Sequence, residues 1–450
     1  MGAYHYQPVV YHPHNQKPSC KNPGYFVSKP TCAWLACGFL SLALLHLLCC
    51  DPTATRQAAF SPLRQYINNT YSFVSTVPGG GKSCNYSEGS WVWAPGHGRR
   101  YNATECNVKE SHDCIRNGRH DTGYLDWRWQ PAGNCPLLAF DATLFLTVVR
   151  GKHVAFIGDS MARNQAQSLI CLLTAGATFP YRLLYRGTGA YPDKYNYWRY
   201  AFPSHDVTVS FYWTPFLVRA EGKSVDDGLL HNYVHLDEPH DRWAADADTI
   251  DVAVLTAGHW FLNGAVYYNG SEVIGVHNAP PEFTNHTIIG YAWPLRVAYR
   301  SAMEWLLSSG RPQPRTLVLA TFSPSHFEGE PAENPTSWVC RKTEPYTEGE
   351  KEMAWVVKDT RGIVHDEAEA AKARYDGNGG GGAVRIEVLD VTKLAAMRPD
   401  GHPGVYMNRD PFAHDGVQVE KLVSDCLHFC LPGPVDTFNE ILVQLLKRGR

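Results

Sequence analysis

The sequence predicts an α/β protein in which a central, mainly parallel sheet is flanked by helices. In the last two thirds of the chain, short apolar runs of buried-strand type alternate with segments of helical length. Before them, residues 84–136 are rich in Cys, Trp and Gly and lack helical periodicity, which predicts short strands and loops stapled by disulfides. Residues 31–50 form an uncharged apolar stretch, which predicts an N-terminal transmembrane helix.

Composition is that of a folded protein and excludes one class of partner. The chain has 450 residues, of which 44% are hydrophobic, and a formal net charge of −3. Without a basic excess, nucleic acid is not an expected partner. The 13 Trp, 24 Tyr and 18 Phe leave flat rings that could stack on sugar rings in a cleft.

The apolar stretch TCAWLACGFLSLALLHLLCC divides the chain into a cytosolic and a lumenal part. It contains no Asp, Glu, Lys or Arg and is long enough to cross a bilayer. A cleaved signal peptide is the alternative, but it would begin nearer the N-terminus and end at a small-residue site. Lysines on the N-terminal flank place that side in the cytosol. We therefore expect a cytosolic tail at residues 1–30, an uncleaved anchor at 31–50, a lumenal stem at 51–83 and a lumenal domain at 84–450.

Sequons and cysteines agree with a lumenal body. Glycosylation sequons follow the anchor at Asn68, Asn85, Asn102, Asn269 and Asn285. An even number of cysteines also follows it, which predicts four disulfides in an oxidising compartment; they are Cys84, Cys106, Cys114, Cys135, Cys171, Cys340, Cys426 and Cys430. Zinc is the competing interpretation, but only the Cys426/Cys430 neighbourhood comes near the spacing of zinc ligands. Disulfides are favoured.

The elements of the lumenal domain follow from apolar runs and helix signals. Buried strands are expected at 153–157, 252–256, 316–320 and 385–391, and an edge strand or hairpin at 207–213. Helices are expected at 161–175, 295–309, 347–374 and 437–448. In the last helix, Thr437 and Glu440 have the spacing of a capping box. The glycine-rich run at 377–382 predicts a surface loop without chemistry.

Ser160 is the first candidate catalytic residue. In VAFIGDSMARNQ the strand residues 154–157 are followed by Gly158-Asp159-Ser160, which break the strand, and a helix-forming segment follows at once. Such a turn presents a serine at a helix N-terminus, beside backbone N–H donors. Asp and Ser are also the usual helix caps. From this stretch alone, Ser160 is either a nucleophile or a cap.

Asp425 and His428 are the candidate partners of that serine. Three residues apart, they share a face of a helical turn, where the carboxylate could hold the imidazole Nδ1–H and leave Nε2 as a base. Cys426 and Cys430 bracket His428, so two disulfides could fix the position of this segment.

An oxyanion site needs backbone donors at the same edge of the sheet. The N–H groups of Ser160 and Gly258, the latter in the loop after strand 252–256, are the candidates. His259 either lines the cleft or is a packed core histidine. Arg163 and Asn164 follow the serine by one turn and either reach a substrate or bond back to the turn.

Together these residues resemble the trichome birefringence-like proteins of plants, which belong to the esterase superfamily with a Gly-Asp-Ser motif (SGNH/GDSL-like). The Gly158-Asp159-Ser160 stretch with its following RNQ, and the stretch from Asp425 to His428, match the two signatures of that family. The resemblance covers residues 84–446 and includes SEGSWV, WRWQP, RTLVLATFSPSHFEG and RPDGHPG. It implies polysaccharide O-acetyltransferase activity in the Golgi membrane, with Ser160, His428 and Asp425 as the triad.

The resemblance also implies a disulfide order and a substrate class. The pairs would be Cys84–Cys135, Cys106–Cys171, Cys114–Cys430 and Cys340–Cys426. In its detailed sequence, the chain is most similar to the subgroup that acts on xyloglucan, and the mannan and xylan enzymes are near relatives. GVHNAPPEF at 275–283 departs from the cysteine-bearing stretch of those relatives, which leaves the polymer open.

The chemistry expected of such a triad needs no metal and no bound cofactor, only an acetyl donor such as acetyl-CoA or a derived carrier. The expected partner is a polysaccharide acceptor. Two other functions use the same sequence features. An acetyl-esterase would pass the acetyl group to water through the same triad. A wall-polysaccharide-binding protein would keep the cleft but have an unreactive Ser160.

Overall fold

The computed structural model describes ten stretches of the chain: residues 84–96, 100–106, 108–133, 135–186, 196–225, 229–308, 315–328, 339–376, 384–413 and 422–448. The expected tail, anchor and stem, Asn68 and the glycine-rich run at 377–382 lie outside them. Within these stretches, no helix combines the length and the apolar character that a membrane span requires.

A seven-stranded mixed sheet forms the centre of the fold, in the order β13-β12-β9-β3-β6-β5-β4. Its strands are β3 (His153–Gly158), β4 (Arg182–Arg186), β5 (Tyr197–Phe202), β6 (Val207–Trp213), β9 (Val252–Thr256), β12 (Arg315–Ala320) and β13 (Val384–Leu389). The five neighbouring strands β13, β12, β9, β3 and β6 run parallel to one another. β5 is antiparallel to both of its neighbours, β6 and β4. All four strands predicted from apolar runs are therefore present. β3, β9 and β12 are buried as expected, whereas β13 is an edge strand with only Ile386 and Leu389 buried.

The prediction for residues 207–213 was half right. β6 forms a hairpin with β5, but it lies inside the sheet, between β3 and β5. Five of its seven residues are buried, because both faces of the strand are covered. A strand covered on both faces loses the clean polar alternation that marks a half-exposed strand.

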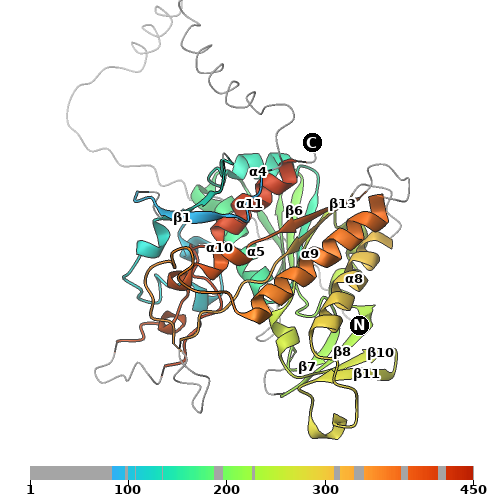
Figure 1. Ribbon diagram of the computed structural model, residues 1–450. Coiled ribbons are helices and arrows are strands. Elements are labelled where there is room, and N and C mark those ends of the chain that lie inside the picture. Colours follow the sequence, from blue (N-terminus) through green and yellow to red (C-terminus); the bar gives the residue numbers. More distant parts are fainter. Residues whose placement is uncertain are drawn as a thin grey trace, which may run out of the picture. The chain divides into compact units, whose positions relative to one another are not determined.

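Helices cover both faces of this sheet (Figure 1). On one face lie α4 (Ala142–Val148), α5 (Ser160–Thr174) and α11 (Asp436–Lys447); on the other lie α8 (Ala292–Ser308) and α9 (Trp355–Asp376). Alternate residues of β3 serve the two cores: Val154 and Phe156 pack into the first, Ala155 and Ile157 into the second. This use of both faces explains why β3 reads as a continuous apolar run.

All four helices start at residues other than those predicted: α5 at Ser160, α8 at Ala292, α9 at Trp355 and α11 at Asp436. Helix α9 begins at Trp355 rather than at residue 347. Helix α11 begins at Asp436, and its N-cap residue, Val435, makes no side-chain cap. Thr437 and Glu440 are buried, and Glu440 pairs with Arg100 and accepts the Phe140 N–H, so the predicted capping box is wrong. Thr437 and Glu440 have the spacing of a capping box, but the Glu440 carboxylate binds Arg100 and the Phe140 N–H instead of the helix N-terminus.

A second, four-stranded sheet was not predicted. Its order is β11-β10-β8-β7, from β7 (Val218–Gly222), β8 (Asn232–Pro239), β10 (Ala265–Asn269) and β11 (Glu272–His277). It lies beside α8 (Figure 1), where Ser301 donates a hydrogen bond to the Leu236 carbonyl. Two short helices, α7 (Asp241–Ala244) and α10 (Thr392–Ala396), complete the described α-helices.

The N-terminal region consists of short strands and turns, as predicted. β1 (Gly89–Trp93) pairs antiparallel with β2 (Trp127–Pro131), and single 3₁₀ turns lie at Ala103–Glu105, Glu110–His112 and Gly123–Leu125. Disulfides join Cys106 to Cys171, Cys114 to Cys430 and Cys340 to Cys426, with Cα–Cα distances of 5.3, 5.6 and 5.7 Å. Cys84 and Cys135 are disulfide-bonded as well. The three described pairs are those that the resemblance implies, and they leave neither Cys426 nor Cys430 for zinc.

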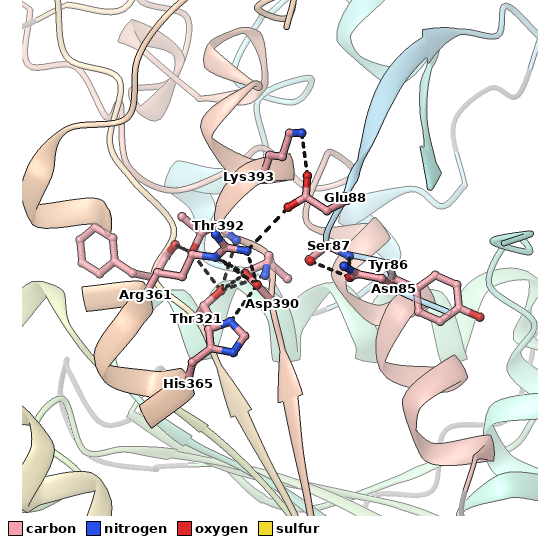
Figure 2. Close-up of polar contacts among 12 residues, drawn as sticks. Asn85, Tyr86, Ser87, Glu88, Thr321, Arg361, His365, Asp390, Thr392 and Lys393 are labelled. Atoms are coloured by element: carbon pink, nitrogen blue, oxygen red, sulfur yellow. Dashed lines mark hydrogen bonds and ion pairs between the residues drawn. The ribbon is translucent and has the colours of Figure 1, made fainter. Parts of the chain in front are cut away.

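A charged cluster joins the N-terminal region to the sheet (Figure 2). Asp390, directly after β13, accepts hydrogen bonds from Arg361 and His365 of α9 at 2.6 and 2.9 Å. Glu88, just before β1, binds Lys393 at 2.8 Å. Burial opposes the Asp390 charge, but His365 and Arg361 outweigh it and lower the pKa of that carboxyl to about 2.

Candidate active site

The turn between β3 and α5 presents Ser160 as the first residue of the helix. A Cβ at Gly158 would lie 2.0 Å from the Thr256 carbonyl oxygen, so only glycine lets β9 approach here. Asp159 is the N-cap, and its side chain accepts the Met161 N–H at 2.9 Å. Its burial raises the pKa of Asp159 to about 6. The cap is therefore Asp159, and the Ser160 hydroxyl is not used for capping.

Asp425 and His428 form a hydrogen-bonded pair. One Asp425 carboxylate oxygen accepts the Leu427 and His428 backbone N–H groups, each at 3.0 Å. The other oxygen lies 2.8 Å from His428 Nδ1. Burial disfavours the carboxylate, but attraction to His428 outweighs it and holds the pKa of Asp425 well below its ordinary value. An ionised Asp425 keeps the proton on Nδ1, which leaves Nε2 as a proton acceptor.

The segment that carries this pair is held from several sides. Disulfides anchor Cys426 and Cys430, the residues that bracket His428. Asp425 exchanges two backbone hydrogen bonds with Gly404, at 2.9 and 3.0 Å. The His428 carbonyl accepts a hydrogen bond from His402 Nδ1 at 2.7 Å. These contacts fix both the backbone and the ring position of His428.

Asn164 connects this segment to the helix of Ser160. Its amide oxygen accepts the Phe429 N–H at 3.1 Å and its amide nitrogen donates to the Phe429 carbonyl at 3.0 Å. Asn164 is four residues after Ser160, so the two side chains lie on one face of α5. Ser160 therefore faces the segment that bears His428. Within the part of the chain that the structure describes, His428 Nε2 is buried and has no hydrogen-bond partner.

Gly258 lies where a second backbone donor is expected. It follows β9, the neighbour of β3, at the same edge of the sheet. A Cβ at this position would lie 2.6 Å from the Phe322 ring, so glycine is required by a close approach. Neither Ser160 N–H nor Gly258 N–H bonds to any carbonyl of the described residues. Both donors are thus available to an oxyanion.

His259 is a packed histidine in this structure. Its Nε2 lies 2.8 Å from the Ser323 carbonyl, and its ring centroid lies 4.1 Å from that of Phe322. Burial lowers the pKa of His259 to about 4. The side chain is half-buried, so it packs on Phe322 without belonging to the buried core.

Aromatic rings stand beside Arg163. Its guanidinium lies over the Trp213 ring at 5.1 Å, and Trp213 meets Trp260 edge-on at 5.7 Å. Trp213 ends β6 and Trp260 follows β9, so both rings flank the strand that leads to Ser160. Arg163 thus packs on Trp213, whereas Asn164 is fully buried and binds Phe429 rather than facing a substrate.

Sequence reasoning missed His112. This residue ends a 3₁₀ turn in the N-terminal region, and its ring stacks on that of His428 with centroids 4.8 Å apart. Its burial, and then repulsion from His428, hold the pKa of His112 well below its ordinary value. In the sequence, the only notable feature of His112 is that it precedes Cys114 by two residues. That spacing does not mark a catalytic motif.

Two family models match consecutive parts of the chain. Residues 82–135 match the PMR5 N-terminal domain, and residues 137–445 match the GDSL/SGNH-like acyl-esterase family found in Pmr5 and Cas1p. The chain belongs to this acyl-esterase family.

Curated relatives match most of the length of this chain. Xyloglucan O-acetyltransferase 1 of Populus trichocarpa is 44% identical over 373 residues, which are 81% of this chain and 82% of the relative. Xyloglucan O-acetyltransferase 1 of Arabidopsis thaliana is 44% identical over 368 residues, 82% of this chain and 81% of the relative. Protein trichome birefringence-like 23 of Arabidopsis thaliana is 33% identical over 374 residues, 82% of each chain. The resemblance seen in the sequence motifs thus extends over about four fifths of the chain.

Proposed function

We propose that this chain is a xyloglucan O-acetyltransferase that works through an acetyl-Ser160 intermediate. One observation of the site carries the proposal. The Asp425–His428 pair leaves a buried, unbonded Nε2 beside the face of α5 that bears Ser160, among the residues described. The acyl-esterase family match supports acyl chemistry at a serine, and the relatives at 44% identity support transfer to xyloglucan.

The reaction has two half-reactions that use the same residues. In the first, His428 Nε2 takes the Ser160 proton, Oγ attacks the carbonyl carbon of an acetyl ester or thioester, and the leaving group departs with that proton. In the second, a sugar hydroxyl gives its proton to Nε2 and attacks the acetyl carbon, and Ser160 recovers a proton. The N–H groups of Ser160 and Gly258 stabilise the oxyanion of both tetrahedral intermediates.

The chain supplies the proton transfers and the dipoles that this mechanism needs. The mechanism is expected to need neither a metal nor a resident cofactor, and the acetyl donor is a co-substrate. A hydrolase would share the first half-reaction and use water in the second. The names of the relatives favour transfer over hydrolysis, and xyloglucan over xylan or mannan.

We further propose a Golgi location as a single-pass type II membrane protein with a lumenal catalytic domain. The uncharged stretch at 31–50 and the sequons that follow it support this topology. Among the described sequons, Asn85, Asn269 and Asn285 are exposed, and Asn102 is half-buried. The disulfides fit an oxidising compartment.

The decisive experiment offers the purified full-length protein an acetyl donor and a panel of xyloglucan, xylan and mannan oligosaccharides. Mass spectrometry should show one added acetyl group on xyloglucan oligosaccharides. The Ser160→Ala protein should fold normally and lose several orders of magnitude in transfer rate. An alanine variant with more than about a tenth of the activity would rule out Ser160 as the nucleophile. Acetate alone, with no acetylated sugar, would identify a hydrolase instead.

A further inference from the structure

His112 is held in place against the segment that bears Asp425 and His428. The Leu431 N–H donates to the His112 carbonyl at 2.8 Å, and Cys114, two residues later, is bonded to Cys430. The imidazole is fully buried. It stacks on His428 with an angle of 29° between the rings. Its position relative to the catalytic base is therefore fixed by covalent and hydrogen bonds.

The contact with Asn164 determines which nitrogen of His112 carries the proton. Phe429 binds both ends of the Asn164 amide, which establishes that the end facing His112 is the nitrogen. That amide nitrogen lies 3.3 Å from His112 Nδ1, so Nδ1 is the acceptor. Because the His112 ring is neutral, its proton is on Nε2.

The Nε2–H of His112 is a buried donor without an acceptor in the part of the chain described here. Leaving such a donor unpaired is unfavourable, because it loses its hydrogen bonds to water without a replacement. Buried polar groups are rarely left so, and those that are often have a functional role. One polar atom from each of His112, Asp425 and His428 lies within 4.8 Å of the other two. The ring that carries the free donor thus borders the Asp425–His428 pair.

We propose that His112 Nε2–H donates a hydrogen bond to the oxygen that attacks acetyl-Ser160, and so positions the acceptor hydroxyl. This inference rests on the proposed function. The attacking oxygen must lie at His428 Nε2, because its proton goes there. The donor belongs to a ring whose centroid lies 4.8 Å from that of His428. A hydroxyl that accepts from His112 while it donates to His428 is held with its remaining lone pair free to attack the acetyl carbon.

The same three residues do not favour a metal ion. A metal ligand must offer a lone pair, and the Asn164 contact leaves His112 Nε2 as a donor. Asp425 already accepts two backbone N–H groups and the His428 ring. A hydrogen-bond donor to substrate therefore fits the contacts better than a zinc site does.

The test compares two rates in the full-length protein. With 4-nitrophenyl acetate as donor, the burst of nitrophenolate reports formation of acetyl-Ser160. The appearance of acetylated xyloglucan oligosaccharide reports its transfer. His112→Phe keeps the ring but removes both nitrogens, and His112→Gln keeps a donor near the Nε2 position. His120→Phe, at an exposed histidine of the same region, is the control and should leave both rates unchanged.

In His112→Phe the ratio of transfer to acylation should fall about tenfold, as expected for the loss of one hydrogen bond to a reacting oxygen. His112→Gln should recover part of that ratio. An unchanged ratio in His112→Phe, whether or not both rates fall together, would overturn the inference. So would stoichiometric zinc in the purified protein that is lost in His112→Phe. If the wild type makes no acetylated sugar, the proposed acceptor is wrong, and the same ratio is then measured with water as the attacking oxygen.

Discussion

At the residue scale, Asp425 has two tasks: it caps the backbone of its own segment and it holds the His428 ring. One of its oxygens holds the backbone of its own segment, and the other holds the His428 ring. The capping task needs only an acceptor, which asparagine also offers. The second task needs a negative charge, because an amide nitrogen in that place would donate to Nδ1 and move the ring proton to Nε2. Substitution by asparagine therefore separates the two tasks.

Asp425→Asn should consequently fold normally and lose activity severely. The loss of the corresponding charge in serine proteases costs about four orders of magnitude in rate. Transfer to xyloglucan oligosaccharide measures the loss, and the urea midpoint of unfolding measures the fold. His428→Ala, which removes the base itself, should be at least as inactive. Activity above about half of the wild-type rate would leave Asp425 with the capping task alone.

At the element scale, the Asp390 cluster couples α9 to the ends of β12 and β13. Arg361 and His365 reach Asp390 from successive turns of α9, and Thr321, directly after β12, donates to it at 3.1 Å. The carboxylate of Asp390 is only 8% exposed. Asp390 therefore links a helix to the ends of two parallel strands through charged and polar hydrogen bonds.

The depressed pKa of Asp390 predicts how this cluster responds to acid. Its pKa is about 2 in the folded chain, against an ordinary value of 3.8. The folded state thus gains about 2 kcal/mol of stability that is fully present above pH 5, halved near pH 3 and mostly lost at pH 2. Asp390→Asn should lower the free energy of unfolding by about that amount at pH 7 and by less at pH 3.

Urea titrations of both proteins at the two pH values test this expectation. Asp366→Asn is the matched control, because Asp366 is on the same helix but is 62% exposed in its pair with Arg296. It should change the unfolding free energy by less than about 1 kcal/mol. If Asp390→Asn lowered the unfolding free energy equally at pH 3 and pH 7, the contribution of Asp390 would come from packing and not from its charge.

Elements with a strong local signal were the ones that sequence could predict. β3, β9 and β12 are apolar runs because both faces of each strand are buried, and the serine turn needs glycine because Thr256 lies so near. The second sheet was missed because its strands mix charged and apolar residues, as in VRAEG and NYVHLDEP. His112 was missed because its role depends on partners from α5 and the C-terminal segment, which no local pattern records.

At the scale of the whole molecule, the two regions that match separate family models share one interior. Trp91 of β1 and Phe438 of α11 belong to the same hydrophobic core. Tyr101 donates to the buried Asp436 at 2.8 Å, and Arg100 pairs with the buried Glu440. Burial raises the pKa of both carboxyls. Two disulfides cross the same boundary.

A fragment that begins at residue 137 should therefore fail to fold. It would keep Asp436 and Glu440 in an apolar interior without Tyr101 and Arg100, and breaking a buried pair costs about 3–5 kcal/mol. It would also lose the disulfides of Cys171 and Cys430, each with a cost of about 2–5 kcal/mol. These losses together match or exceed the total stability of a typical domain, about 5–15 kcal/mol. Calorimetry should show one transition for residues 84–450 and none for residues 137–450. A cooperative transition in the shorter fragment at the same temperature would show that the N-terminal region is a separate domain, and His112 would then join the active site only by docking.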